Sequence, residues 1–126
     1  MPASRSVDPA RLRQELLNVT GWLQGEQDKP QRNQLASAVR LSLRTLEATA
    51  PGRSVEVRVP PFAAIQCLAG PEHTRGTPPN VVETDAYTWL LLATGRLGWD
   101  AAVAAGSVDA SGPRADLSHQ LPIARV

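Results

Sequence analysis

The sequence predicts a small α+β domain, because its apolar residues repeat at two different spacings along the chain. In the first 50 residues they recur every three or four positions, as on one face of a helix. From Val55 to Val59 they alternate with charged residues, as on one face of a strand. The chain has 126 residues, 42% of them hydrophobic, which suits one domain with one buried core. We therefore expect a single domain over residues 1–126, with two helices over 9–50 and a sheet with further helices over 53–126.

The first helix is expected to begin at Asp8-Pro9, because aspartate caps the free amides of a helix and proline suits its first turn. Its apolar face would consist of Leu12, Leu16, Val19 and Leu23. Gly25 should end it, and residues 1–8 are expected to form a flexible N-terminus. A second helix should follow Pro30 and stop at Pro51-Gly52. Its apolar face would consist of Leu35, Val39, Leu43 and Leu46.

Four segments are expected to be strands. The first is Val55–Val59, and the second runs from Phe62 to Leu68 after Pro60-Pro61 interrupts the pairing. Val81, Val82 and Thr84 form a third, and residues 107–111 a fourth. The segment between Gly70 and Asn80 is too rich in proline and glycine for regular structure, so it should be a long loop.

The C-terminal part is expected to contain three further helices. Asp85 should cap a helix that ends near Gly95 and is apolar around most of its circumference. Asp100 should cap a short one over residues 101–105, and residues 114–121 should form a last helix before Pro122. Four alanines of the short segment would leave space beside the sheet: Ala101, Ala102, Ala104 and Ala105.

Composition and charge exclude several classes of function. There are 13 basic and 12 acidic residues, scattered along the chain, so nothing favours nucleic acid as a partner. No apolar run approaches the ~20 residues needed to cross a bilayer, and no secretory leader is evident at the N-terminus, so we expect a soluble cytoplasmic protein without integral membrane association. Glycine-rich nucleotide-binding motifs are absent, and we expect no cofactor.

Reactive side chains are few. Cys67 is the only cysteine, which excludes an internal disulfide and a thiolate zinc site. Cys67 and His73 are near enough in sequence to suggest a thiol nucleophile and its base, but a lone cysteine in an apolar strand is more often a core residue. No ligand spacing ties together the candidate metal ligands, which are His73, Glu83, Asp85 and His119. We therefore expect neither a metal site nor an enzyme.

The order of segments from Asn80 to Leu121 resembles the sterol carrier protein type 2 superfamily, in its small bacterial stand-alone branch. It consists of a strand, an aromatic helix up to Gly95, a short helix into Ala105-Gly106, a strand and, after Gly112, a last amphipathic helix. The middle of the chain, including Arg58 to Phe62 and His73 to Asn80, is similar to the same bacterial branch. The resemblance implies a small, mainly antiparallel sheet of four to five strands covered by helices. It also implies an apolar cavity between the sheet and the C-terminal helices.

A non-catalytic role in binding or carrying a lipid, fatty acid or sterol-like molecule is the function that we expect from this resemblance. Large apolar side chains would line the cavity: Phe62, Ile65, Trp89, Leu92 and Trp99. Arg75, with Gly76 and Thr77 beside it, would grip a carboxylate or phosphate head group.

Each of these assignments has an alternative. Arg75 could instead pair with Glu83 or Asp85 to hold its loop, and the tryptophans could be core residues. The protein could also be an interaction module or homodimer that buries its first helix against a partner or second copy. A third possibility is an accessory catalytic domain that uses Cys67 and His73.

Overall fold

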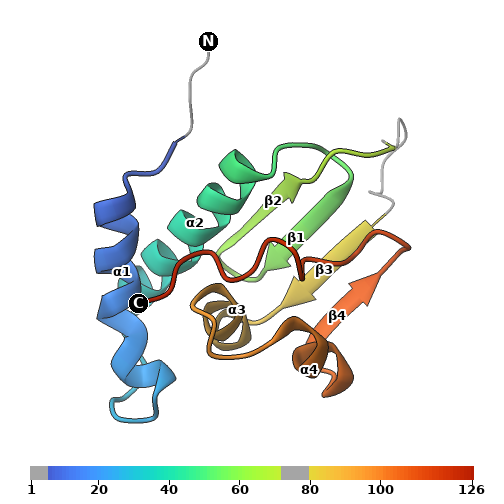
Figure 1. Ribbon diagram of the computed structural model, residues 1–126. Helices are drawn as coiled ribbons and strands as arrows, with labels where there is room; N and C mark the ends of the chain where they lie inside the picture. The colour runs from blue at the N-terminus through green and yellow to red at the C-terminus, as the bar shows by residue number, and fades with distance from the viewer. Residues whose placement is uncertain (1–5, 72–79) are drawn as a thin grey trace.

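The computed structural model describes residues 6–71 and 80–126 (Figure 1). Helices α1 (Pro9–Leu23) and α2 (Arg32–Thr49) come first. They are followed by strands β1 (Val55–Val59), β2 (Ala63–Cys67) and β3 (Asn80–Thr84). Helices α3 (Ala86–Ala93) and α4 (Trp99–Ala104) and strand β4 (Val108–Ser111) complete the order. The α+β class and the two N-terminal helices are therefore as the sequence predicts.

Two of the predicted helix starts are confirmed and one is wrong. The Asp8 carboxylate accepts a hydrogen bond from the Ala10 amide at 3.0 Å, and the Asp85 carboxylate accepts one from the Thr88 amide at 2.8 Å. Asp100 does not cap α4, because Gly98 is the N-cap and Asp100 lies in the first turn. The helix begins earlier because Trp99 and Ala102, three positions apart, share its buried side.

The sheet contains the four described strands in the order β2-β1-β3-β4 (Figure 1). Strand β1 pairs with β2 in antiparallel orientation and β3 pairs with β4 in the same way. The central pair, β1 with β3, is parallel. The sheet is therefore mixed, and the predicted antiparallel character holds for its two outer pairs. Most of the predicted long loop, with His73 and Arg75, lies outside the described residues.

One face of the sheet packs against helices and the other carries its polar positions. Val55, Val57 and Val59 are fully buried on the first face, where α2 and α3 lie and α1 packs on both helices (Figure 1). On the opposite face, Arg58 contacts Glu56 at 2.6 Å and Glu83 of the neighbouring strand at 3.8 Å. The alternation along β1 thus separates a core face from a charged face.

The predicted last helix is absent, and residues 112–126 cross the helical side of the sheet as an irregular segment (Figure 1). The Asp116 carboxylate accepts a hydrogen bond from the Ser118 amide at 2.8 Å, which stabilises a local turn in competition with a helix. Leu117 is nevertheless fully buried. At the start of the segment the Arg114 amide donates to the buried Asn80 side chain at 2.8 Å, while that side chain donates to the Ser54 carbonyl at 2.8 Å.

Candidate functional site

Two residues predicted to line a cavity are core residues in the structure. Trp89 is fully buried and Leu92 is 1% exposed. The Trp89 indole Nε1–H donates to the Ser42 hydroxyl at 2.8 Å, which ties α3 to α2. These side chains occupy the space between the sheet and the helices in which we expected an apolar ligand.

The other predicted residues lie apart from one another. Trp99 lies at the start of α4, and Phe62 lies in the turn between β1 and β2, where its carbonyl accepts a hydrogen bond from Arg40 Nε at 3.1 Å. Ile65 is partly buried on β2, opposite Val57. Arg75 lies outside the described residues. The structure therefore does not bring the predicted residues together around one cavity.

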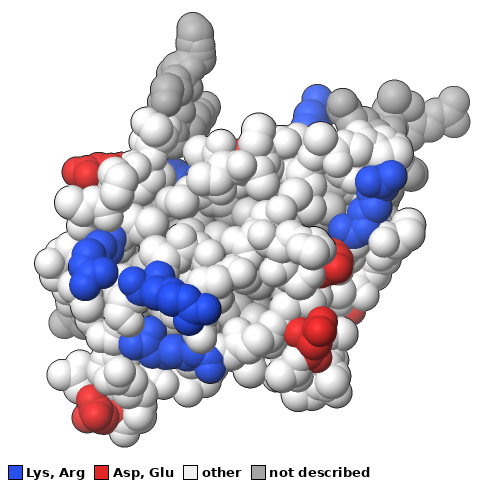
Figure 2. Space-filling model, viewed as in Figure 1, with Lys and Arg blue, Asp and Glu red and all other residues white. Residues whose placement is uncertain are grey.

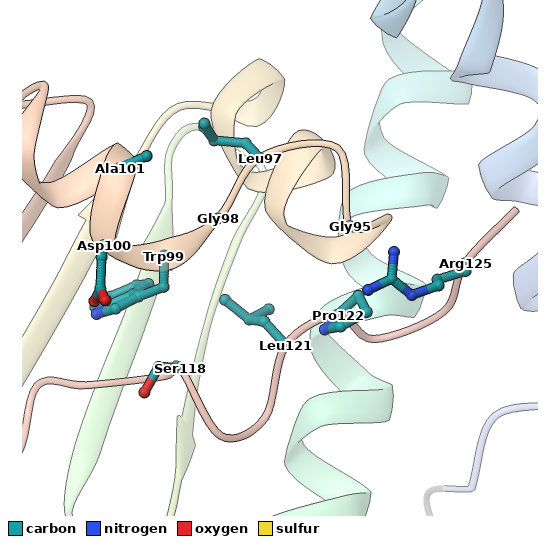
Figure 3. Close-up of a pocket in the computed structure, with 10 residues that line it drawn as sticks. All are labelled: Gly95, Leu97, Gly98, Trp99, Asp100, Ala101, Ser118, Leu121, Pro122 and Arg125. Atoms are coloured by element: carbon teal, nitrogen blue, oxygen red, sulfur yellow. The ribbon is translucent and has the colours of Figure 1, made fainter.

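The first hollow, which we call the C-terminal cleft, lies between the α3–α4 turn and the C-terminal segment (Figure 3). Its volume is about 330 Å³. Its lining consists of Gly95, Leu97, Gly98, Trp99, Asp100, Ala101, Ser118, Leu121, Pro122 and Arg125. Of the predicted ligand-binding residues, Trp99 lines this cleft.

Backbone hydrogen bonds hold both sides of the C-terminal cleft. On one side, the Arg96 and Leu97 amides donate to the Leu91 carbonyl at 2.8 and 3.2 Å, closing the turn after α3. On the other, the Ile123 and Ala124 amides donate to the Ala93 carbonyl at 2.8 and 3.0 Å. The cleft therefore forms where the C-terminal segment is fastened to the end of α3.

Polar groups lie at opposite ends of the C-terminal cleft. Figure 3 shows Asp100 beside Trp99 at one end and Arg125 beside Pro122 and Gly95 at the other. Gly95 has a φ of +79°, and a Cβ there would lie 2.6 Å from an Arg125 guanidinium nitrogen. Glycine thus allows both the turn and the close approach of Arg125. The arrangement offers an apolar wall with a cation at one end.

The alanines of α4 do not create this space in the way that the sequence predicts. Ala101, Ala104 and Ala105 are exposed, and Ala102 is buried. Ala101 alone among them lines the C-terminal cleft. The prediction was wrong because α4 packs on the domain mainly through Trp99 and Ala102, which leaves its other side in solvent.

A second hollow, which we call the hairpin pocket, lies beside the β1–β2 turn and has a volume of about 370 Å³. Its lining consists of Trp22, Lys29, Arg32, Leu35, Pro60, Pro61, Phe62, Asp85, Ala86 and Tyr87. Of these residues, Phe62 was a predicted ligand-binding residue and Asp85 a candidate metal ligand. The lining residues come from α1, the α1–α2 loop, α2, the turn and α3, so their convergence depends on the tertiary fold.

Cys67 is a core residue and is poorly suited to act as a nucleophile. It is fully buried, and burial raises the pKa of its thiol to about 11, with Glu47 contributing by charge repulsion. The reactive thiolate is therefore scarce at neutral pH. In the described residues, no three His, Cys, Asp or Glu side chains gather as a metal site. The predicted partner His73 lies outside that part of the chain.

The distribution of charge on the surface and the hydropathy of the helices are relevant to the kinds of partner that the protein can bind. Figure 2 shows a largely uncharged centre on the face crossed by the C-terminal segment, with basic side chains on the left and at the upper right and acidic ones on the left edge and toward the lower right. None of the described helices is both long and apolar enough to cross a membrane.

Comparison with known proteins identifies the family. No curated protein matches the chain. The family model described as bacterial SCP ortholog, that is, sterol carrier protein ortholog, matches residues 31–123. The match covers well over half of the chain, from the start of α2 to the C-terminal segment, and leaves α1 outside. The predicted resemblance is thereby confirmed, and the chain belongs to the bacterial sterol carrier protein ortholog family.

Proposed function

We propose that this protein binds and carries an apolar small molecule in the C-terminal cleft, without catalysing a reaction. Membership of a carrier-type family supports the general role. The observation that carries the location is a cleft of about 330 Å³, near the lower end of the ~300–1,000 Å³ typical of small-molecule sites. It is walled by the apolar side chains of Leu97, Trp99, Leu121 and Pro122.

The ligand that fits best is a small fatty-acid-like molecule. Its chain would lie along Trp99 and Leu121, where each buried methylene contributes roughly 0.8 kcal/mol. Its carboxylate would lie at the end occupied by Arg125, because a guanidinium donates paired hydrogen bonds to a carboxylate. Asp100 at the opposite end would repel a second negative charge.

Filling the cleft tests the proposal. Ala101→Trp places a large side chain in the lining from an exposed helical position, whereas Ala104→Trp adds the same side chain on α4 outside the lining. We expect Ala101→Trp to lower the affinity for decanoate at least about tenfold, as measured by displacement of a fluorescent fatty acid. Ala104→Trp should leave this affinity unchanged. Equal affinities in the two variants, or no binding of any lipid class, would show the proposal to be wrong.

Arg125→Gln tests the head-group assignment separately. We expect this variant to lose affinity for decanoate but to bind decanol like the unmodified protein, because only the carboxylate requires the cation. A parallel loss for both compounds would indicate that Arg125 supports the shape of the cleft instead.

A further inference from the structure

The hairpin pocket brings together most of the aromatic side chains of this protein. The chain has only three Trp, one Tyr and one Phe, and three of these five line the pocket: Trp22, Phe62 and Tyr87. Trp22 and Tyr87 meet edge to face, with ring centroids 4.9 Å apart and an angle of 66°. Tyr87 is 41% exposed although α3 is otherwise largely buried. Tyr87 is thus at the surface, while Trp22 and Phe62 are partly buried and pack against the edge of the core.

Two cations accompany these rings. Lys29, the only lysine in the sequence, and Arg32 both line the pocket. The Arg32 guanidinium carbon lies 5.5 Å from the centre of the Phe62 ring. Neither cation forms an ion pair with an acid in the described part of the chain. A cation–π contact with Phe62 does not use the guanidinium N–H groups, so they can still donate to an anion.

The acid in the lining is already engaged. The Asp85 carboxylate accepts the Thr88 amide at the start of α3, so it faces the positive end of that helix. An anion in the pocket would therefore bind on the side of Lys29 and Arg32, away from Asp85.

We propose that the hairpin pocket is a second binding site, specific for a small planar aromatic carboxylate. The ring of the ligand would pack against Trp22, Phe62 and Tyr87, and its carboxylate would accept hydrogen bonds from Arg32 and Lys29. Flat rings favour stacked or edge-to-face contacts that a flexible alkyl chain does not provide. The site is separate from the C-terminal cleft, since the two share no lining residue, and it does not depend on the function proposed for that cleft.

Amide shifts in two-dimensional NMR spectra of the full chain, titrated with 2-naphthoate, test this proposal. We expect shifts at Trp22, Arg32, Phe62 and Tyr87 and binding at least about tenfold tighter than that of the neutral analogue 2-naphthamide, because a charged hydrogen-bonded pair is lost with the amide. Arg32→Gln should weaken binding of 2-naphthoate by a similar factor. Arg44→Gln is the matched control, because Arg44 is an exposed residue of the same helix outside the pocket lining, and it should leave binding unchanged.

Several results would overturn the proposal. Shifts confined to Leu97, Trp99 and Leu121 would place the compound in the C-terminal cleft instead. Equal affinity for 2-naphthoate and 2-naphthamide would show that Lys29 and Arg32 do not bind the carboxylate. The absence of shifts at millimolar concentration would show that the pocket takes no such ligand, whatever the fatty-acid measurements give.

Discussion

At the scale of single residues, hydrogen bonding shows why Trp89 belongs to the core. An indole N–H that enters the interior without an acceptor costs free energy, and the Ser42 hydroxyl at 2.8 Å supplies that acceptor. Ser42 in turn donates to the Ala38 carbonyl at 2.7 Å. A ligand-binding role for Trp89 would require this buried arrangement to open.

Cys67 gives a prediction at the same scale. Its pKa of about 11 lies above the ordinary value of 9.0, so the folded protein keeps the thiol proton at a pH where the unfolded chain loses it. Its contribution to stability is therefore complete below about pH 9 and is lost as the pH rises to about 11. We expect iodoacetamide to alkylate Cys67 slowly at pH 8 until urea unfolds the protein. Between pH 9 and 11, the free energy of unfolding of Cys67→Ala should decrease less than that of the unmodified protein.

Rapid alkylation of the native protein would contradict this. It would show that the thiol is accessible and would revive the catalytic alternative, which could then be tested by the activity of Cys67→Ser.

At the scale of helices and strands, the sequence predicted most of what the structure contains. Helices α1 and α2 and strand β1 follow directly from apolar spacing, because the apolar residues of each lie on one buried side. The predicted last helix was wrong because Leu117 and Leu121 have helical spacing, yet Leu117 is buried and Leu121 is partly buried without a helix. Eight residues give a helix little stability of their own, and the turn at Asp116 competes with it.

The candidate site was less predictable than the elements. Trp99, Leu121 and Arg125 line one cleft only because the C-terminal segment turns back to the end of α3. Phe62 and Tyr87 line the hairpin pocket because β1 and β3 are parallel neighbours, which brings the residues following each strand to the same end of the sheet. Neither arrangement leaves a periodic pattern in the sequence.

Leu117 gives a prediction at the scale of the C-terminal segment. It is fully buried, so Leu117→Ala should lower the free energy of unfolding by about 2–5 kcal/mol and loosen the segment. Urea denaturation measures the first effect, and faster hydrogen exchange at the Ile123 and Ala124 amides measures the second. Leu121→Ala is the comparison, because Leu121 is only partly buried and lines the cleft: it should cost less stability but reduce fatty-acid binding.

At the scale of the whole molecule, the first helix has a partner within its own chain. The apolar side of α1, formed by Leu12, Leu16, Val19 and Leu23, is buried, and α1 packs on α2 and α3. The reason for expecting a homodimer was that this side needed a second copy to cover it. In the structure the same chain supplies the cover, and a homodimer stays an untested prediction.

Removal of α1 tests this assignment. A chain that starts at residue 25 would expose the surfaces of α2 and α3 on which α1 packs, so we expect it to self-associate or lose cooperative unfolding. The 126-residue chain should scatter light as one copy of 13.5 kDa at the same concentration. A dimer of the 126-residue chain that disappears on truncation would instead show that α1 forms the interface.

The charged face of the sheet also helps to determine the register in which the strands pair. Sliding β1 by one residue would turn Arg58 and Glu56 beneath the helices and expel the three valines beside them. The shifted sheet would bury two charged side chains, which costs desolvation free energy, and it would also lose the burial of the valines. Both effects make the shifted pairing less stable than the native one. Glu56 and Arg58 thus contribute little to the stability of the native fold, but they disfavour the strand pairing that is shifted by one residue.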